Sequence, residues 1–549
     1  MIRLSTSNLT YQSYTHMALF RPPLCYSSHP YDEILTRTAQ RFPENEAVIF
    51  GDVNLTYREL DALVNAFANA LLDMGICKGQ TVGLFMRNRA ELLISWFAIT
   101  RIGAIVCPMN PSYKDRELAY QLNNSEAVAI VVQQELLQLV DTIHAQTPAL
   151  KDVIIVGSDM HVSLSHVHSF NHLVHNYPAT PPMHSKLAWE EVIALPYSSG
   201  TTGLPKGVML THKNLVSNAS QSLAAARITS LDRLLVFLPL YHIYGIMLIG
   251  TAVMSGATIV LMDRFEASEC LGLIHKQRIT LLHTVPHILA VLSDWPQLND
   301  YDLHTVRYAK CGASPVPPAL VHHFQERTHI TVVPAYGLTE AAPETHTNPV
   351  YDQRLIKVET IGLPIHDTKQ KIVDIETGQI ELGVGEEGEL IIQGPQVMQG
   401  YWRTPEATAE VLRDGWLYTG DIGFYDEEGY VTITGRKKDL IKYKGFSVAP
   451  AEIEALLLEH PAVSDVGIIA QPNEQAGEQP KAFVVLRKGY ESQSADELMM
   501  WANSKLATYK NVREIEFIDT IPRNPSGKIL RHILKAREQQ KMNSSLTRS

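Results

Sequence analysis

From residue 60 onward the chain alternates between stretches with helical spacing of apolar residues and short, continuous apolar runs. Residues 60–74 and 89–102 have the helical pattern, and each stretch ends at a glycine, Gly75 or Gly103. Short apolar runs predict strands at residues 81–86, 127–132 and 153–156. Helices and strands in alternation are typical of parallel sheets with helices on both faces. The predicted fold class is therefore α/β.

The pattern becomes richer in strands in the last third of the chain. Strands between tight turns are predicted at residues 371–374, 389–393 and 430–434. After Gly435 a smaller α+β unit is predicted, and the basic residues 436–438 mark the joint before it. Its expected segments are a helix at 451–459, strands near 466–470 and 482–486, a helix capped by Ser494 with Glu497 at the capping-box position, and a last helix at 529–541.

Length, charge and cysteine content narrow the classes of function. A chain of 549 residues exceeds what one hydrophobic core normally supports, which predicts more than one domain. The net charge of −11 argues against a nucleic-acid partner. Five scattered cysteines without a C-x-x-C pair favour a reducing compartment, so we predict a cytoplasmic location. The uncharged stretch 234–262 contains Pro239 and several polar side chains, which favours a buried helix–strand pair over a membrane span. Residues 1–27 are predicted to form an unstructured extension.

The segment YSSGTTGLPKG at residues 197–207 predicts a loop that holds a chain of phosphates. Glycines let backbone N–H groups turn around phosphate oxygens, hydroxyls donate to those oxygens, and a lysine neutralises them. It is not a Walker loop, because Pro205 stands where a second glycine is required. Apolar runs on both sides indicate that the loop joins two strands. The candidate phosphate-binding residues are Ser198, Ser199, Gly200, Thr201, Thr202, Gly203 and Lys206.

Four further segments carry groups suited to nucleotide chemistry. Residues 336–340 (YGLTE) combine an aromatic ring, which can stack on adenine, with a carboxylate that can hold Mg²⁺. Asp421 follows a tight turn, and one fixed carboxylate is suited to gripping two ribose hydroxyls. The segment 435–445 (GRKKDLIKYKG) is cationic, and the turn at 521–528 (IPRNPSGK) presents Lys528.

In this order and spacing the motifs resemble the acyl-adenylate-forming superfamily, which includes acyl-CoA and aryl-CoA synthetases, firefly-type luciferases and amino-acid adenylation domains. The resemblance extends over residues 28–541. It implies a large N-terminal domain of two packed α/β subdomains and a distorted β-barrel, followed by a small mobile α+β domain. The expected divisions are an extension (1–27), an AMP-binding domain (28–435), a C-terminal lid (436–541) and a tail (542–549).

The resemblance also implies two half-reactions at one site. A carboxylate attacks the α-phosphate of Mg·ATP to give acyl-AMP and pyrophosphate, and the thiol of coenzyme A (CoA) then displaces AMP. The cofactors expected are therefore ATP, Mg²⁺ and CoA. By motif position, the resemblance implies that Lys528 stabilises the α-phosphoryl group and that Thr339 and Glu340 bind phosphate and metal. The nucleotide would be held by an adenine frame of Gly312, Ala313, Ser314, Tyr336 and Gly337 and by Asp421 and Arg436 at the ribose. Lys438 would be the hinge, and Lys442, Lys444 and Gly445 would belong to a thiol-facing loop.

The residues expected around the acid limit the substrate class. His242, which we count among the catalytic residues, stands where amino-acid adenylation domains need an aspartate, so a simple organic acid is favoured. The pocket walls implied by position are Tyr244, Val285, Gly312, Gly337 and Ala342. The small residues among them leave room for a long or flat apolar group. Glu344 departs from the apolar residue common at its position, so either it points away from the pocket or the substrate has a polar tail.

Several functions remain open at this stage. The first interpretation is a CoA ligase for medium- or long-chain fatty acids, with an aryl-acid (4-coumarate-like) CoA ligase as runner-up. A fatty acyl-AMP ligase that loads a carrier protein, a luciferase and a catalytically silent acyl-nucleotide sensor are further alternatives. No nucleic-acid partner and no transmembrane segment are expected, and a homodimer is one prediction for the assembly.

Overall fold

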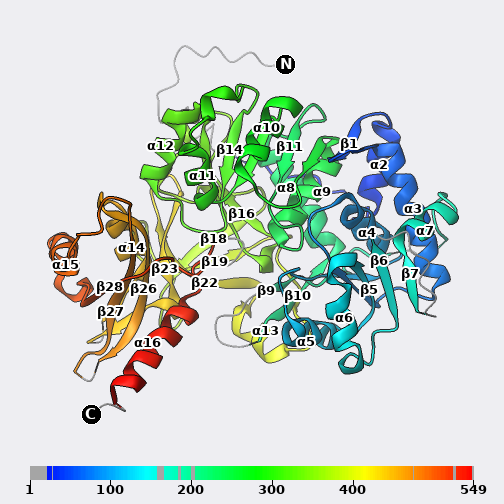
Figure 1. Cartoon of the computed structure of the whole chain (residues 1–549). Coiled ribbons are helices and arrows are strands. Elements are labelled where there is room, and N and C mark those ends of the chain that lie inside the picture. Colours follow the sequence, from blue (N-terminus) through cyan, green and yellow to red (C-terminus); the bar gives the residue numbers. More distant parts are fainter. Residues whose placement is uncertain are drawn as a thin grey trace.

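The computed structural model describes residues 21–27, 29–157, 166–183, 187–198, 204–444, 446–473, 475–523 and 527–546 (Figure 1). Five residues of the predicted phosphate loop (Ser199, Gly200, Thr201, Thr202 and Gly203), together with Gly445, lie outside these ranges. Most elements form one large body, and the C-terminal elements form a smaller lobe at the left of Figure 1. A large N-terminal domain and a small C-terminal one, as predicted, are therefore confirmed.

The first sheet of the large body has nine strands. Its centre is parallel, and antiparallel strands complete both edges. In spatial order the strands are β17 (Leu363–Pro364), β16 (Glu344–Thr347), β15 (Val332–Gly337), β14 (Tyr308–Cys311), β13 (Leu281–Thr284), β11 (Arg233–Val236), β12 (Thr258–Leu261), β1 (Glu46–Phe50) and β2 (Val53–Thr56).

The second sheet is also nine-stranded and parallel over most of its width. The strands are β20 (Gly400–Tyr401), β10 (Lys206–Thr211), β8 (Val192–Ala194), β4 (Ile105–Pro108), β3 (Thr81–Phe85), β5 (Ala127–Gln133), β6 (Asp152–Val156) and β7 (Val167–Ser169), with β9 (Tyr197–Ser198) paired to β10. Because β9 and β10 are antiparallel neighbours, the candidate phosphate loop joins two strands, as predicted.

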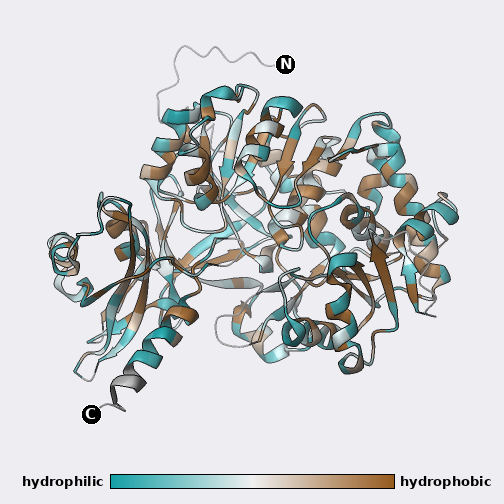
Figure 2. Ribbon diagram, viewed as in Figure 1, coloured by the Kyte–Doolittle hydropathy of each residue, from teal (hydrophilic) through white to brown (hydrophobic). Residues whose placement is uncertain are grey.

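Helices cover the sheets and fill the space between them (Figure 2), with hydrophobic residues concentrated on strands and inner helices. In α4 all residues but Glu91 are buried, and α9 is buried over most of its length, which confirms a buried helix for the apolar stretch 234–262. The helices of the large body are α2 (Glu33–Arg41), α3 (Tyr57–Asp73), α4 (Ala90–Arg101), α5 (Asp115–Ser125), α6 (Leu137–Ile143), α7 (Phe170–Asn176), α8 (His212–Ala226), α9 (Ile243–Ser255), α10 (Ala267–Gln277), α11 (Pro286–Ser293), α12 (Pro318–Thr328) and α13 (Pro405–Val411).

Two five-stranded sheets follow. The antiparallel third sheet contains β18 (Lys369–Val373), β19 (Gly388–Gln393), β21 (Leu412–Arg413), β22 (Trp416–Tyr425) and β23 (Val431–Arg436). The fourth, in the C-terminal lobe, contains β24 (Ile441–Tyr443), β25 (Phe446–Val448), β26 (Val463–Asn473), β27 (Gly477–Leu486) and β28 (Glu514–Phe517). The helices of this lobe are α14 (Pro450–Leu458), α15 (Ala495–Asn503) and α16 (Arg531–Leu546).

Three local predictions need correction. Ser494 is the N-cap of α15, but its side chain makes no capping hydrogen bond, and the Glu497 carboxylate accepts from Gln493 Nε2 at 3.4 Å. The last helix begins at Arg531 and not at Ile529, since Ile529 pairs with Arg523 in a β-bridge.

The third correction concerns the N-terminal extension. Residues 21–27 have no helix or strand, yet they are docked and not unstructured. Arg21 Nη1 donates to the carbonyl oxygen of Pro364 at 2.8 Å, and the Tyr26 hydroxyl donates to Asp367 at 2.6 Å. Among the residues described, none of the helices is both long and apolar enough to span a bilayer.

Candidate active site

Asp421 is the centre of a charged cluster at the edge of the large body. It lies on β22 directly opposite Arg436 on β23, so that Arg436 Nε donates to Asp421 Oδ1 at 2.6 Å. The Tyr336 hydroxyl, at the end of β15, donates to the other carboxylate oxygen. Burial acts to lower the pKa of Arg436, but the charge of Asp421 outweighs it and raises that pKa. The structure thus brings together three residues predicted to bind adenine and ribose.

The cluster is supported by Glu389, which sequence reasoning missed. Glu389 is 3% exposed; one of its carboxylate oxygens accepts from the backbone N–H of Gly420 at 3.0 Å and the other from Lys437 Nζ at 2.9 Å. It therefore fixes the backbone just before Asp421 and binds the side chain of the residue just after Arg436. Because Glu389 is on β19, its partners are 31 and 48 residues away in sequence.

Tyr401 links two other predicted residues and was also missed. Its hydroxyl donates to Glu340 Oε1 at 2.9 Å, and Lys206 Nζ lies 5.2 Å from the centroid of its ring. The backbone N–H of Met398 donates to the carbonyl of Glu340 at 2.8 Å. The candidate metal-binding carboxylate and the lysine of the phosphate loop thus share one aromatic neighbour. Thr339 lies beside Glu340 in the same 3₁₀ turn, Thr339–Ala341.

Lys528 reaches this site from the C-terminal lobe. The preceding Gly527, with φ +83°, packs against α11: a Cβ placed on it would lie 2.9 Å from His287 Nδ1. Arg523 Nη1 donates to the Gly527 carbonyl at 2.6 Å. Burial and the neighbouring charge of Arg436 lower the pKa of Lys528 to about 8. The predicted α-phosphoryl cation is therefore close to the predicted ribose-binding residues.

The predicted hinge and the predicted thiol-facing loop lie in different surroundings. Lys438, in the 3₁₀ turn Lys437–Asp439, has its pKa lowered to about 8 by burial and by the charges of Arg436 and Lys528. Lys442 and Lys444 are exposed, and the backbone N–H of Lys442 donates to Glu478 within the C-terminal lobe at 2.8 Å. The structure groups Lys528, and not these two lysines, with Asp421 and Arg436.

The acid side of the site begins at His242, the N-cap of α9. His242 Nδ1 accepts from the backbone N–H of Tyr244 at 3.3 Å. Burial, and then the charge of Lys528, lower the pKa of His242 to about 4, so its imidazole is neutral at ordinary pH. A cavity of about 10 Å³ lies here, lined by Leu238, Pro239, His242, Tyr244, Val285 and Ala313.

Two glycines, Gly312 and Gly337, allow close backbone approach at the ends of β14 and β15. A Cβ on Gly312 would lie 3.0 Å from the carbonyl oxygen of Ala335 and 3.9 Å from the Tyr244 ring. A Cβ on Gly337 would lie 2.3 Å from the Pro343 carbonyl oxygen, which no side chain could tolerate. Ala342, also predicted to line the pocket, is 1% exposed. Of the residues predicted for the pocket, Tyr244 and Val285 thus line this cavity and Gly312 lies against Tyr244.

Glu344 is buried and paired inside the protein. Its side chain forms an ion pair with Lys310 of β14 and accepts from the Ser222 hydroxyl of α8. Asn218, one turn earlier on α8, bonds to both the backbone N–H and the carbonyl of Glu344. Lys310 and Glu344 are 1% and 4% exposed. The unusual acid therefore has a complete set of internal partners, which the sequence pattern did not predict.

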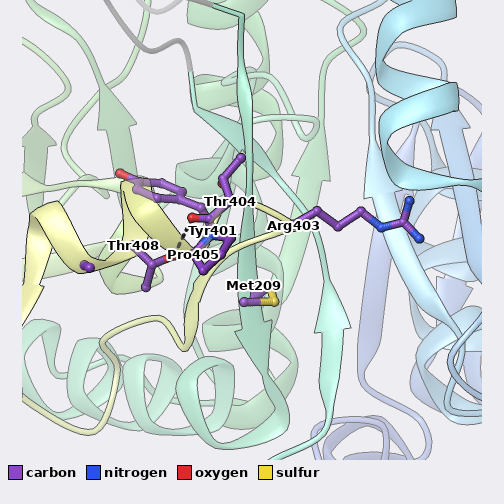
Figure 3. A pocket seen from close by; sticks show the side chains of 7 residues that line it. Met209, Tyr401, Arg403, Thr404, Pro405 and Thr408 are labelled. Carbon is purple, nitrogen blue, oxygen red and sulfur yellow. Dashed lines mark hydrogen bonds between the residues drawn. The ribbon is translucent and has the colours of Figure 1, made fainter.

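A larger cavity, of about 410 Å³, lies between β10 and α13 (Figure 3). In Figure 3 Arg403 extends away from the other lining side chains; it forms an ion pair with Glu126 at 2.6 Å. None of the residues predicted to bind nucleotide or acid lines it. The lining residues are Met209, Tyr401, Arg403, Thr404, Pro405, Thr408 and Ala409.

The carboxylates present fit a Mg²⁺ ion that arrives with nucleotide phosphates. In the part of the chain that the structure describes, no group of three or more His, Cys, Asp or Glu side chains could hold a metal by itself. Mg²⁺ is usually bound by one or two carboxylates together with substrate phosphates, and Glu340 provides one such carboxylate close to Lys206.

Comparisons with known proteins identify the family. Residues 35–402 match the AMP-binding enzyme family, and residues 452–528 match the AMP-binding enzyme C-terminal domain. The chain is 34% identical to a long-chain-fatty-acid–CoA ligase of Bacillus subtilis (strain 168) over 92% of this chain and 94% of the relative. It is 36% identical to the 4-coumarate–CoA ligase CCL1 of Humulus lupulus, covering 90% of this chain and 89% of the relative.

A solved structure supports the same assignment. The anthranilate CoA ligase AuaEII in complex with anthranoyl-AMP matches with a TM-score of 0.86 and 28% identity, covering 94% of this chain and 98% of that chain. ATP, Mg²⁺ and CoA are the cofactors and co-substrates of such ligases. The chain therefore belongs to the AMP-binding enzyme family, as an AMP-forming ligase that joins an acyl or aryl acid to CoA.

Proposed function

We propose that this ligase activates a compact aryl-type carboxylic acid as acyl-AMP and transfers it to CoA. The observation that carries the proposal is the buried Lys310–Glu344 ion pair beside the acid pocket. Burial, and then the charge of Glu344, raise the pKa of Tyr244, which lines the pocket cavity. An alkyl tail that displaced polar partners from such a pair would leave buried charge uncompensated, at a cost of about 3–5 kcal/mol.

Fatty acids, placed first by the sequence, form the second candidate. The relative from B. subtilis named for long-chain fatty acids supports that reading. Ligases named for 4-coumarate in hop and anthranilate in the solved complex support the aryl reading. The charged groups behind the cavity at His242 and Tyr244 favour a short acid over a long alkyl tail.

For the first half-reaction we propose that Lys528 stabilises the negative charge that develops on the α-phosphoryl oxygens. Its burial and its closeness to Arg436 and His242 support this role. Asp421 would accept from the ribose hydroxyls, Tyr336 would face the adenine, and Thr339 would contact the α-phosphate. Glu340 would hold Mg²⁺, which neutralises phosphate charge when it is bound. His242, neutral at the mouth of the acid pocket, would orient the carboxylate for attack.

For the second half-reaction we propose a rotation of the C-terminal lobe about Lys438. The exposed positions of Lys442 and Lys444 support it, because they lie away from Asp421 while Lys528 is close. Rotation would withdraw Lys528 and present the loop that includes Gly445 to the thiol. Domains at residues 28–435 and 436–541 fit this motion. The homodimer and the cytoplasmic location stay predictions.

A panel of acids tests the substrate class. We expect CoA-dependent release of AMP from ATP with cinnamic, hydroxycinnamic and aminobenzoic acids, faster than with dodecanoic or hexadecanoic acid. A fatty acid that outpaces every aryl acid by roughly tenfold, about 1.4 kcal/mol of barrier, would overturn the aryl assignment. Turnover on a holo carrier protein and none on CoA would favour the carrier-loading alternative. Light emission with oxygen would indicate a luciferase. A catalytically silent sensor would show no acid-dependent ATP–pyrophosphate exchange, whereas each of the enzymes would show it.

A further inference from the structure

His283 is a buried histidine that contacts Tyr244, a residue lining the cavity on the acid side. It lies on β13, directly beside Lys310 in the register of β13 and β14, and is 2% exposed. Its Nδ1 is 3.2 Å from the Tyr244 hydroxyl, and the two rings meet edge to face at 5.9 Å between centroids. Tyr244 itself lines the cavity at His242. His283 is therefore one side chain removed from the space where the acid is expected.

Half of the hydrogen-bonding capacity of His283 is unused. Its Nε2 is buried and has no hydrogen-bond partner among the residues that the structure describes. His346, two strands beyond Lys310 in the same sheet, shows the ordinary arrangement: Nδ1 is 2.9 Å from Thr345 Oγ1, and Nε2 is 2.8 Å from Gln370 Oε1. Buried polar atoms are normally paired, so the bare Nε2 needs an explanation.

Contact with the pocket distinguishes His283 from another histidine that shares this feature. His212 Nε2 is also without a partner among the described residues, but His212 begins α8 and its Nδ1 accepts from the backbone N–H of Tyr31. His212 thus contacts the docked start of α2, whereas His283 contacts a residue that lines the cavity. Only His283 carries its unused polar atom on a ring that contacts a side chain lining the cavity.

The ring of His283 carries a single proton. Burial, and then the charge of Lys310, lower its pKa to about 3. If the Tyr244 hydroxyl donates to Nδ1, then Nε2 carries the proton and can only donate. If the hydroxyl instead accepts from Nδ1, then Nε2 can only accept. In either tautomer Nε2 therefore lacks one hydrogen bond, to an acceptor in the first case and from a donor in the second.

From these contacts we infer that His283, held by Tyr244, is a specificity-determining residue that binds a hydroxyl group at the end of the acid distant from its carboxylate. This inference rests on the proposed function and names its substrate class more closely. A hydroxyl both donates and accepts, so it satisfies either tautomer, whereas a methyl group satisfies neither. A charged end group is disfavoured, because Lys310 and Glu344 already neutralise each other.

The test uses acid pairs that differ only in the end group. We would measure kcat/KM for 4-hydroxycinnamic and 4-methylcinnamic acid with wild type, His283→Leu, His283→Gln and the exposed control His322→Leu. Wild type and the control should prefer the hydroxy acid by roughly tenfold to a hundredfold, the scale for leaving a buried polar atom unpaired. His283→Leu should abolish that preference through loss on the hydroxy acid alone. His283→Gln, which keeps polar atoms, should restore part of it.

Two outcomes overturn the inference: a wild type that does not distinguish the pair, and a His283→Leu variant that loses both acids by the same factor. Thermal unfolding checks that the variants are folded; if His283→Leu is not, Tyr244→Phe replaces it and should reduce the same preference. If only fatty acids are substrates, the aryl proposal fails, and the pair 12-hydroxydodecanoic and tridecanoic acid decides the role of His283 by the same criteria.

Discussion

The nucleotide side and the acid side of this site use polar residues in opposite ways. On the nucleotide side Asp421 and Arg436 are paired at 2.6 Å, and the Arg436 side chain is 31% exposed. On the acid side Lys310 and Glu344 form a pair whose side chains are 2% and 4% exposed. Two histidines there, His242 and His283, are kept neutral by burial.

The difference shows which groups are able to exchange partners. A partly exposed arginine can exchange one hydrogen-bond partner for another at modest cost in free energy, because water solvates its charge during the exchange. A fully buried pair cannot, since a lone charge in the interior is costly. We therefore expect substitutions on the acid side to change stability first, and substitutions on the nucleotide side to change rate first.

The largest effect should follow from breaking the buried pair. Lys310→Met leaves Glu344 charged and without its partner, and should lower the free energy of unfolding by about 3–5 kcal/mol. Denaturant unfolding followed by fluorescence measures this loss. Lys535→Met, on the exposed face of α16, is the matched control and should change little. The double variant Lys310→Met/Glu344→Leu should recover part of the loss; a loss as large in the double variant would contradict the ion-pair explanation.

Next in size is the loss of Lys528. Lys528→Ala should slow acid-dependent ATP–pyrophosphate exchange by roughly 10²–10³-fold, the scale for removing one donor to a transition-state oxyanion. Thioester formation from purified acyl-AMP should be much less affected, because that step uses the rotated lobe. Lys535→Ala again serves as control, and Lys442→Ala should show the reverse preference. Equal losses in both half-reactions for Lys528→Ala would rule out the rotation.

A smaller effect is expected at the ribose side. Asp421→Asn removes the negative charge that binds Arg436 and that accepts the hydrogen bond of the Tyr336 hydroxyl. We expect it to raise KM for ATP by roughly 10–100-fold, the scale of one charged hydrogen bond. The unfolding midpoint should stay within a few degrees of wild type. Asp414→Asn, exposed in the turn between β21 and β22, is the control. A fall in kcat with unchanged KM would assign Asp421 to the chemical step instead.

The sequence predicted most elements whose patterns are local and few of the contacts between distant residues. Helix α3 and strand β5 were placed within three residues, because their apolar spacing repeats over a short stretch. Asp421, Arg436 and Tyr336 were predicted through motifs, and their side chains meet. No local pattern could have revealed partners that are many residues apart in sequence. The missed contacts are Tyr401–Glu340, Lys310–Glu344 and Tyr244–His283.

The smallest predicted effect is a pH dependence that separates two lysines of the nucleotide side. Burial and the charge of Arg436 lower the pKa of Lys528 to about 8, from an ordinary value of 10.5. The protonated lysine is the active form, so kcat/KM for ATP should be flat below pH 7 and should fall about tenfold per pH unit above 8. Because the pKa of His242 is about 4, His242 adds no second step between pH 5 and 7.

Lys438 also has a pKa of about 8, which makes it the matched control for this profile. Lys528→Arg replaces the ammonium with a guanidinium that stays charged, so the fall above pH 8 should disappear, although the plateau is lower. Lys438→Arg should keep the fall, because the hinge lysine does not contact the reacting phosphate. A fall that persists in Lys528→Arg and disappears in Lys438→Arg would move the titrating group to the hinge, and would mean that the nucleotide side is limited by lobe movement and not by its charges.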